Sequence, residues 1–312
     1  MKLIRGLHNL QACHCGCVLT IGNFDGFHRG HQALITQLQT EGRKFGLPVM
    51  VMIFEPQPQE HFAGRDAPTR LTRLRDKIKY LAEAGVDVVL CVTFDVRFAA
   101  ISAESFVTDL LVRKLGVRFL CVGDDFRFGT QRRGDFAFLQ QMGAAAGFDV
   151  MSTATYATGG KRISSTAVRE ALASDQLVVA EMLLGHPYRI SGRVEHGDEL
   201  GRTLGFPTAN VSLKGRPAPI NGVYAVEVNG LGPQPIEGVA NIGTRPTVAG
   251  LRQRVEVHLL DVAMDIYGCH IEVVVRAKLR NEQRFASLDE LKRQITNDAV
   301  AGREFFRLAA PL

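Results

Sequence analysis

The segment Thr20–His31 constrains the fold of this 312-residue chain more than any other part of its sequence. It reads T-I-G-N-F-D-G-F-H-R-G-H and joins an apolar run at Val18–Ile21, typical of a buried strand, to a helical pattern over Gln32–Phe45. His28 and His31 therefore come at the start of a helix, where unpaired backbone N–H groups and the helix dipole favour a phosphate. The sequence thus predicts a strand, a phosphate-binding turn and a helix in succession.

The two histidines and the glycine between them have the order H-x-G-H. Two imidazoles three residues apart can donate hydrogen bonds to a triphosphate, and Gly30 lets the phosphates approach the backbone. Nucleotidylyltransferases, which join a nucleoside monophosphate to an acceptor and release pyrophosphate, carry this arrangement. The longer pattern G-x-F-D-G-x-H-x-G-H, set between strand and helix, argues against a chance match.

Composition limits the class of protein. The chain is 46% hydrophobic and 22% charged, as in ordinary globular proteins, and is long enough for two domains. No apolar run approaches the length that crosses a bilayer, and Met1–Leu10 lacks the apolar core of a secretory signal. We therefore expect a cytoplasmic protein with no membrane partner.

The net charge of +5 does not by itself identify a partner. Lys and Arg are scattered among acidic residues, without a basic block or an aromatic-interleaved stripe. A mildly basic surface suits anionic nucleotides equally well. We expect no nucleic-acid partner.

Six cysteines are present. Cys91, Cys121 and Cys269 lie in or beside apolar runs, where buried reduced thiols are common. The cluster C-H-C-G-C at 13–17 does not have the C-x-x-C spacing of structural zinc sites, and no second suitable pair follows. We interpret it as incidental thiols that are sensitive to oxidation.

Strand and helix patterns alternate in the first half of the chain. This alternation predicts a Rossmann-like α/β domain, with a parallel sheet that binds ligands beyond the carboxyl ends of its strands. The loops in those places are 23–31, 55–62 and 123–135. The predicted strands are Val18–Ile21, Val49–Phe54, Val86–Phe94 and Phe119–Val122, and the predicted helices are Gln32–Phe45, Leu71–Ala84 and Ser105–Leu115.

The pattern changes after a predicted helix at Ser165–Leu184, which the residues G-H-P at 185–187 end. Short β segments between Gly/Pro turns then predict a mostly antiparallel β-barrel, closed by a helix that starts with a capping box at Ser287 and Glu290 and runs to about Phe306. We therefore expect domains at 1–184 and 185–312. The predicted barrel strands are Tyr188–Glu195, Gly222–Val228, Gly238–Ile242, Arg254–Leu260 and His270–Ala277.

Three further motifs identify a family. They are V-G-D-D-F-R-F-G at 122–129, R-I-S-S-T-A-V-R at 162–169 and L-G-F-P-T-A-N at 204–210. With the H-x-G-H segment, they resemble the bacterial bifunctional riboflavin kinase/FAD synthetase family from about residue 15 to about residue 308. The resemblance continues through N-I-G-T-R-P-T at 241–247, E-V-H-L-L-D at 256–261 and Y-G at 267–268.

The resemblance implies two reactions. The C-terminal domain would phosphorylate riboflavin with ATP to give FMN, and the N-terminal domain would transfer AMP from a second ATP to FMN, giving FAD and pyrophosphate. Both reactions would need Mg²⁺, and the flavins would be substrates and products. The expected partners are riboflavin, FMN, FAD and ATP, and a homo-oligomer is compatible with the sequence.

The expected adenylyltransferase site aligns two anions and stabilises charge, because the attacking group is already a phosphate. His28 and His31 would hold the ATP phosphates. Ser165 and Thr166, at a helix start, offer hydroxyl and backbone N–H groups, and Arg169, one turn further, supplies a bidentate cation.

Several other residues have two interpretations. Asn23 and Asp25 can orient a phosphate or Mg²⁺, but turn formation explains both nearly as well. Arg162, in the second motif, is a further phosphate-binding candidate.

For the flavin, Asp125 can hydrogen-bond the substrate or satisfy its own loop. Phe62 and Phe128 can stack on the ring, although an aromatic at a strand end is more often part of the core. The family's F-E-P-H-P segment has Gln57 in place of His here. Glutamine cannot carry charge, so a contact with phosphate there would alter nucleotide affinity and weaken the synthetase.

The expected kinase site has no Walker A loop. The Gly-rich segment 197–205, including Gly201 and Arg202, can wrap phosphates with its backbone. Thr208 and Asn210, two apart on an extended chain, face the same way and offer hard oxygen donors for Mg²⁺.

A general base is useful for attack by a neutral alcohol, and the family's candidate is Glu256. Because side chains alternate along a strand, Glu256 faces the side opposite to the apolar Val255 and Val257. By this pattern alone, Glu256 could equally be a solvent-exposed strand residue. Arg280 and Glu282 resemble a flavin-side segment of the family.

Three other classes of function were weighed. An adenylyltransferase that makes NAD or dephospho-coenzyme A also uses H-x-G-H, but leaves the P-T-A-N segment unexplained. A non-enzymatic flavin or nucleotide regulator would lack catalytic side chains that this chain retains. A nucleic-acid binder would bind in a salt-dependent way, and the charge pattern does not favour it.

Overall fold

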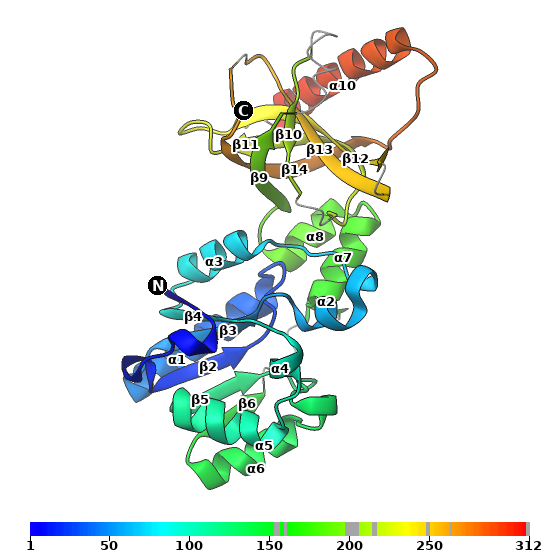
Figure 1. Ribbon diagram of the computed structural model, residues 1–312. Helices are drawn as coiled ribbons and strands as arrows, with labels where there is room; N and C mark the ends of the chain where they lie inside the picture. The colour runs from blue at the N-terminus through cyan, green and yellow to red at the C-terminus, as the bar shows by residue number, and fades with distance from the viewer. Residues whose placement is uncertain are drawn as a thin grey trace. The chain divides into compact units, whose positions relative to one another are not determined.

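The computed structural model describes residues 1–152, 157–158, 161–196, 206–213, 217–247, 250–262 and 264–309 (Figure 1). The chain divides into two compact units. The first comprises Met1–Pro68 and Leu74–Ser164, and the second comprises Thr69–Arg73 and Ser165–Leu312. The helices after Ser164 therefore group with the second unit, while a functional boundary at 184/185 stays a prediction.

A six-stranded parallel sheet forms the centre of the first unit, in the order β1-β4-β3-β2-β5-β6 (Figure 1). Every residue of β2, β3 and β4 is buried, as expected for parallel strands that helices cover on both faces. This is the Rossmann-like arrangement predicted from the sequence. The strands are β1 (Lys2–Arg5), β2 (Cys17–Ile21), β3 (Val49–Phe54), β4 (Val88–Val92), β5 (Val117–Val122) and β6 (Asp149–Ser152), with a separate pair β7 (Ala157–Thr158) and β8 (Lys161–Arg162).

Two hydrophobic clusters pack against this sheet. One contains Leu34, Ile35 and Leu38 from α1 with Leu81 from α3, and the other contains buried residues of η4 and α6. The helices are α1 (Arg29–Phe45), α2 (Pro58–Ala63), α3 (Leu74–Glu83), α4 (Val96–Ala99), α5 (Ala103–Ser105), the π-helical η4 (Phe106–Lys114) and α6 (Phe136–Ala146), with short 3₁₀ turns η1 (Leu7–Asn9), η2 (Ala12–His14), η3 (Gly64–Asp66) and η5 (Thr130–Arg132).

The sequence analysis did not predict β1, α2, α6 or β6. In β1 only Ile4 is buried, so the strand lacks a hydrophobic pattern and is held by parallel pairing with β4. The expectation of a buried Cys269 is wrong, because this thiol is exposed, whereas Cys91 and Cys121 are buried.

The second unit begins with two helices, α7 (Ser165–Ala173) and α8 (Leu177–Leu184). The prediction of one continuous helix is wrong, because Asp175 adopts a left-handed φ of 58° between them. Its carboxylate accepts hydrogen bonds from Lys278 Nζ at 2.6 Å and from the Tyr224 hydroxyl at 3.4 Å. Tertiary contacts therefore stabilise the break. Gly185 ends α8 in a left-handed conformation, as predicted.

A closed antiparallel barrel follows, in the order β10-β13-β12-β11-β14-β9 (Figure 1). Ala209, Ala240, Val255 and Val257 belong to its buried face, and the residues that alternate with them face outward. The sequence analysis missed the three-residue strand β10. The strands are β9 (Arg189–Glu195), β10 (Ala209–Val211), β11 (Gly222–Asn229), β12 (Ile236–Thr247), β13 (Gly250–Leu259) and β14 (His270–Arg280).

The long helix α10 (Leu288–Ala309) packs on the outside of the barrel through Ala299, Gly302 and Phe306. Ser287 Oγ accepts a hydrogen bond from Glu290 N–H at 3.2 Å, which is one half of the predicted capping box. The Glu290 carboxylate accepts from the N–H of Ala286 at 3.0 Å in place of that of Ser287. No helix in the described ranges is long and apolar enough to span a membrane.

The contact between α10 and the barrel gives a stability prediction. A Cβ atom at Gly302 would lie 2.7 Å from Cγ2 of Val239, so Gly302→Val forces α10 away from the barrel. We expect the free energy of unfolding to fall by about 1–3 kcal/mol, measured by urea denaturation of the barrel. Val300→Ala, at an exposed position of the same helix, should leave the free energy of unfolding within about 0.5 kcal/mol of that of the unmodified protein. Equal stability of both variants would contradict this packing.

Candidate active sites

The turn after β2 is held by two phenylalanines in unusual backbone conformations. Phe24 and Phe27 have positive φ angles of 49° and 42°, and both rings are buried. The Phe27 ring also stacks on Tyr80 of α3, with centroids 5.9 Å apart and planes 11° apart. The turn is therefore fixed by packing before any ligand arrives.

α1 begins at Arg29, three residues before the predicted start at Gln32, so His28 and His31 lie at its first turn. His28 is the N-cap, and its Nδ1 accepts a hydrogen bond from the backbone N–H of His31 at 3.4 Å. The two imidazole rings stack with centroids 3.7 Å apart and planes 15° apart. A Cβ at Gly30 would lie 3.2 Å from the His28 ring, so glycine here also preserves the histidine geometry.

His31 is enclosed by aromatic rings. The Phe24 centroid is 4.7 Å from its own, and its Nδ1 is buried without a hydrogen-bond partner among the described residues. Burial lowers the pKa of the His31 imidazole well below its usual value, and the positive charges of His28 and Lys77 lower it further. His31 is therefore neutral at neutral pH and can donate only one ring N–H.

The other polar residues of this turn are Asn23, which is half-buried, and Asp25, which is buried. Both lie beside the histidine pair in the chain, at the carboxyl end of the sheet. The Asp25 side chain makes polar interactions within the protein. Asp25 therefore has interactions within the protein that help to hold the turn.

Gln57 follows the neighbouring strand β3 and lies at the same edge of the sheet. It is the N-cap of α2, where its backbone N–H donates to Glu60 Oε2 at 2.9 Å. Its side chain is only 3% exposed, and its Nε2 has no hydrogen-bond partner among the described residues. A buried amide donor without an acceptor is costly, and this amide has the capacity to donate to a ligand oxygen.

The expected flavin contacts of the first unit have different environments. Phe62 is 72% exposed, with its ring edge-to-face with Phe94 at 5.7 Å. Phe128 is 7% exposed and packs against Phe106, so its ring belongs to the core. Asp125 is exposed in the loop after β5 and has polar interactions within the protein.

The remaining phosphate candidates lie outside the histidine turn. Ser165 and Thr166 begin α7 in the second unit, and Arg169 Nε donates to the backbone oxygen of Thr69 at 2.6 Å. Arg162 is in β8, with its side chain outside the described residues, and Gly201 and Arg202 also lie outside them.

Glu256 lies between two asparagines on the barrel. It is directly opposite Asn210 of β10 on one side and opposite Asn241 of β12 on the other. Val255 and Val257 are fully buried, so Glu256 faces outward, as predicted. Directly opposed residues of antiparallel strands share a face, with Cβ atoms about 4.5–5.5 Å apart. The three polar side chains therefore form one row, Asn210–Glu256–Asn241.

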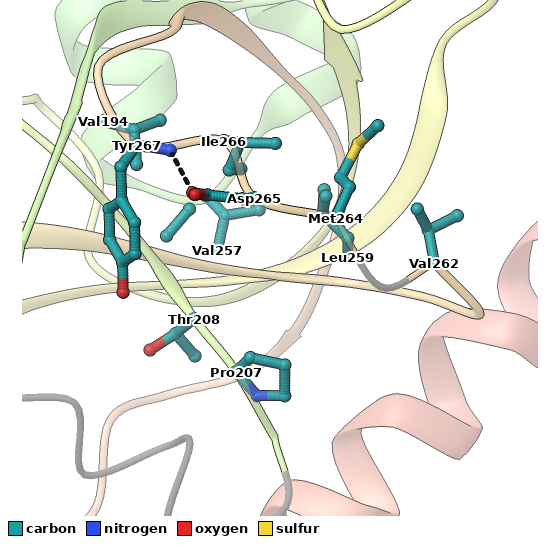
Figure 2. Close-up of a pocket in the computed structure, with 11 residues that line it drawn as sticks. Val194, Pro207, Thr208, Val257, Leu259, Val262, Met264, Asp265, Ile266 and Tyr267 are labelled. Atoms are coloured by element: carbon teal, nitrogen blue, oxygen red, sulfur yellow. Dashed lines mark hydrogen bonds between the residues drawn. The ribbon is translucent and has the colours of Figure 1, made fainter.

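A cavity of about 410 Å³ adjoins the start of β10 (Figure 2). The Pro207 backbone oxygen lies 3.0 Å from Nδ1 of His258 on β13, which fixes the approach to Thr208. Most of the lining is apolar, with Thr208, Asp265 and Tyr267 as its polar side chains. The lining residues are Val194, Pro207, Thr208, Ala209, Val257, Leu259, Val262, Met264, Asp265, Ile266 and Tyr267.

Arg280 and Glu282 make contacts within the barrel unit. The Arg280 guanidinium donates two hydrogen bonds to the buried carboxylate of Asp298 in α10, at 2.8 and 2.7 Å. Glu282 Oε2 accepts from the backbone N–H of Thr244 at 3.3 Å, next to Gly243 of β12. Arg280 thus anchors α10, and Glu282 lies near the outward face that carries Asn241.

Within the described ranges, no group of three or more His, Cys, Asp or Glu side chains converges as a metal site. Thr208 and Asn210 instead offer hydroxyl and amide oxygens. Such hard donors fit a divalent cation whose other ligands are water and nucleotide oxygens.

Two protein-family models match the chain, one described as FAD synthetase over residues 10–167 and one described as riboflavin kinase over residues 184–306. A bifunctional riboflavin kinase/FMN adenylyltransferase of Escherichia coli K12 is 69% identical over the full length of both chains. One from Haemophilus influenzae is 52% identical over 98% of this chain and 99% of its own. A solved structure from Streptococcus pneumoniae, titled a macrolide-efflux protein, is 28% identical with a TM-score of 0.82, over 97% of this chain and 99% of that one.

The depressed pKa of His31 gives a prediction about stability. Below the usual histidine pKa of 6.5 the unfolded chain takes up a proton that the folded protein refuses, so stability falls as pH falls from about 7 to 5. In His31→Gln, the dependence of the free energy of unfolding on pH should become less steep, by up to about 1.4 kcal/mol per pH unit. Urea unfolding of the first unit at several pH values measures this slope. His8→Gln, which removes an exposed imidazole, should leave the slope unchanged. Parallel slopes for His31→Gln and the unmodified protein would refute the assignment.

Proposed function

The chain belongs to the bifunctional riboflavin kinase/FMN adenylyltransferase family, and we propose that the stacked histidines of the first unit and Glu256 of the second carry its two reactions. Its C-terminal domain phosphorylates riboflavin, and its N-terminal domain adenylylates FMN to FAD, both with ATP. The resemblance found in the sequence is thereby confirmed. The observation that carries the proposal is the stacked histidine pair at the carboxyl end of the sheet in the first unit, together with the row Asn210–Glu256–Asn241 on the barrel of the second.

Adenylyl transfer needs alignment more than acid–base chemistry. A phosphate oxygen of FMN attacks the α-phosphorus of ATP, and the bond from that phosphorus to the bridging oxygen breaks to release pyrophosphate. His28 and the neutral His31 donate hydrogen bonds to the phosphates, aided by the positive end of the helix dipole at the start of α1. Because burial and aromatic packing fix His31, little reorganisation accompanies the reaction.

Further phosphate ligands are proposed from α7 and its approach. Ser165 and Thr166 offer hydroxyl and N–H groups at a helix start, and Arg169 supplies positive charge, with its orientation fixed by Thr69. We also retain Arg162 as a phosphate ligand. Asn23 and Asp25 keep their proposed role in orienting a phosphate or the cation.

For the flavin of FMN, Phe62 is the favoured stacking residue because its ring is exposed. Asp125 is a proposed hydrogen-bond partner in the loop after β5. Phe128 would support this site from the core, given its burial against Phe106.

Riboflavin phosphorylation begins from a neutral alcohol. Glu256 accepts the proton of the ribityl 5′-hydroxyl as its oxygen attacks the γ-phosphorus of ATP, and ADP leaves with the electron pair of the broken bond. The 410 Å³ cavity is the proposed place of the nucleotide, because its apolar lining suits a base and Thr208 lies at its edge. Gly201 and Arg202 remain proposed phosphate ligands, and Arg280 and Glu282 remain proposed on the flavin side.

We propose Mg²⁺ as the cation, held by the oxygens of Thr208 and Asn210. When bound, it neutralises charge on the phosphates. We further propose that the boundary between the two functional domains lies at 184/185. We also propose that the protein is cytoplasmic and binds no nucleic acid, and that it is compatible with a homo-oligomeric state. Free thiols at the buried Cys17, Cys91 and Cys121 fit a reducing compartment.

Single substitutions should separate the two activities. His28→Asn keeps a residue type that caps helices but removes the imidazole, so FAD formation from FMN should fall about 100-fold while riboflavin phosphorylation is retained. Glu256→Gln should lower riboflavin phosphorylation about 100-fold or more and leave FAD formation from FMN intact. Chromatography of flavin products measures both. Loss of the same activity in both variants would overturn the division of labour.

Gln57 provides a second test of the adenylyltransferase site. If its buried amide donates to a ligand phosphate, Gln57→Ala should raise the KM for ATP or FMN about tenfold, the effect of one lost hydrogen bond. Gln57→His should retain more affinity, because imidazole also donates. Gln59→Ala, at an exposed position of the same helix, is the matched control. An unchanged KM in Gln57→Ala would exclude Gln57 from the site.

A further inference from the structure

We propose that Lys278 and Asp175 are positioning residues for adenylyl transfer, because their ion pair fixes the helix α7 that carries the proposed phosphate ligand Arg169. Lys278 lies on β14 of the barrel, and Asp175 lies in the break between α7 and α8. The inference rests on the proposed role of Arg169 in binding ATP. Neither Lys278 nor Asp175 touches a reacting atom in this account.

The break after α7 has the hydrogen bonds of a Schellman motif, in which glycine is the usual residue. The N–H of Asp175 donates to the backbone oxygen of Leu172 at 3.1 Å, and the N–H of Gln176 donates to that of Ala171 at 2.8 Å. Asp175 has the left-handed φ of 58° that this motif requires. Because glycine would end the helix with less strain, the aspartate at this position indicates a role for its carboxylate beyond ending α7.

The barrel contacts both oxygens of this carboxylate. Lys278 Nζ donates to Oδ2 at 2.6 Å, and the Tyr224 hydroxyl lies 3.4 Å from Oδ1 while it donates to the Asn221 backbone oxygen at 2.9 Å. Tyr224 and Lys278 are direct partners across β11 and β14, and the Lys278 ammonium lies 6.0 Å from the Tyr224 ring centroid. Tyr224 is fully buried, and the Lys278 side chain is only 18% exposed. The ion pair is therefore better ordered than a pair of fully exposed charges.

A second connection holds another part of α7. Arg169 Nε donates to the backbone oxygen of Thr69 at 2.6 Å, and Thr69 belongs to the segment Thr69–Arg73 that groups with the barrel. The Arg73 guanidinium donates in turn to the backbone oxygen of Ser212, directly after β10. Because the two connections reach the barrel at different strands, a tilt of α7 breaks at least one of them. The barrel thus sets the orientation of the helix that presents Arg169.

Loss of the ion pair should impair ATP binding for one reaction only. Lys278→Met keeps the apolar stem of the side chain and removes its donor. We expect the KM for ATP in FAD formation from FMN to rise about threefold to tenfold, part of the effect of one lost charge-assisted hydrogen bond. In riboflavin phosphorylation, kcat and the KM values should stay within about twofold of those of the unmodified protein.

Arg276→Met is the matched control for the loss of charge. Arg276 lies on the same strand as Lys278, but it pairs with Glu227 of β11 at 3.0 Å, within the barrel. This variant should change neither reaction.

Two substitutions of Asp175 separate positioning from helix termination. Asp175→Asn tolerates the left-handed conformation but loses the charge, and Asp175→Gly adopts that conformation without strain. Both should raise the KM for ATP in FAD formation as Lys278→Met does. A residue needed only to end α7 would leave this KM unchanged in Asp175→Gly.

A double-mutant cycle on the full-length protein provides the decisive result. Adding Lys278→Met to Asp175→Asn should raise the KM for ATP no further, because both substitutions remove the same contact. An unchanged KM in both single variants, independent effects in the double variant, or an equal loss of both activities would overturn the inference. Arg169→Ala tests the premise separately. An unchanged KM for ATP in that variant would instead refute the proposed role of Arg169.

Discussion

The proposed adenylyltransferase site depends on the burial of two rings in the turn between β2 and α1. A left-handed backbone conformation at a non-glycine residue costs about 1–3 kcal/mol, and burying a phenylalanine side chain contributes about 1.5–3 kcal/mol. Phe24 and Phe27 each have a left-handed backbone conformation and a buried ring, so the burial of the rings offsets the strain of the turn. This turn sets the first residue of α1, the stacking of His28 on His31 and the burial of the His31 Nδ1 atom. The site is therefore formed by the core rather than by its ligand.

The two units present phosphate-handling groups in physically different ways. In the first, the start of a helix lies at the carboxyl end of a parallel sheet. In the second, polar side chains alternate outward from a closed barrel, and cross-strand register fixes their spacing. This difference follows the chemistry. Attack by an existing phosphate anion needs alignment, whereas attack by an alcohol needs a base. The proposed base, Glu256, lies between two neighbouring strands.

Local patterns in the sequence predicted much of this arrangement. Strong apolar runs located β2 and β3, and alternation correctly oriented Glu256. Features that depend on distant contacts were missed. The strand β10 has three residues and is too short for a periodic signal, and the helix break at Asp175 is stabilised by Lys278 and Tyr224 from the barrel. The burial of the Gln57 amide and the pairing of Asn241 with Glu256 follow from tertiary packing and register, which no single segment encodes.

One chain performs two successive transfers, phosphorylation of riboflavin and adenylylation of FMN. The most direct test incubates the purified protein with riboflavin, ATP and Mg²⁺ and follows flavins, ADP and pyrophosphate over time by chromatography and a pyrophosphate assay. FMN and ADP should appear first, followed by FAD, with one ADP and one pyrophosphate formed for each FAD. Folded protein that leaves riboflavin unchanged, or that forms FAD without the matching ADP and pyrophosphate, would contradict the account.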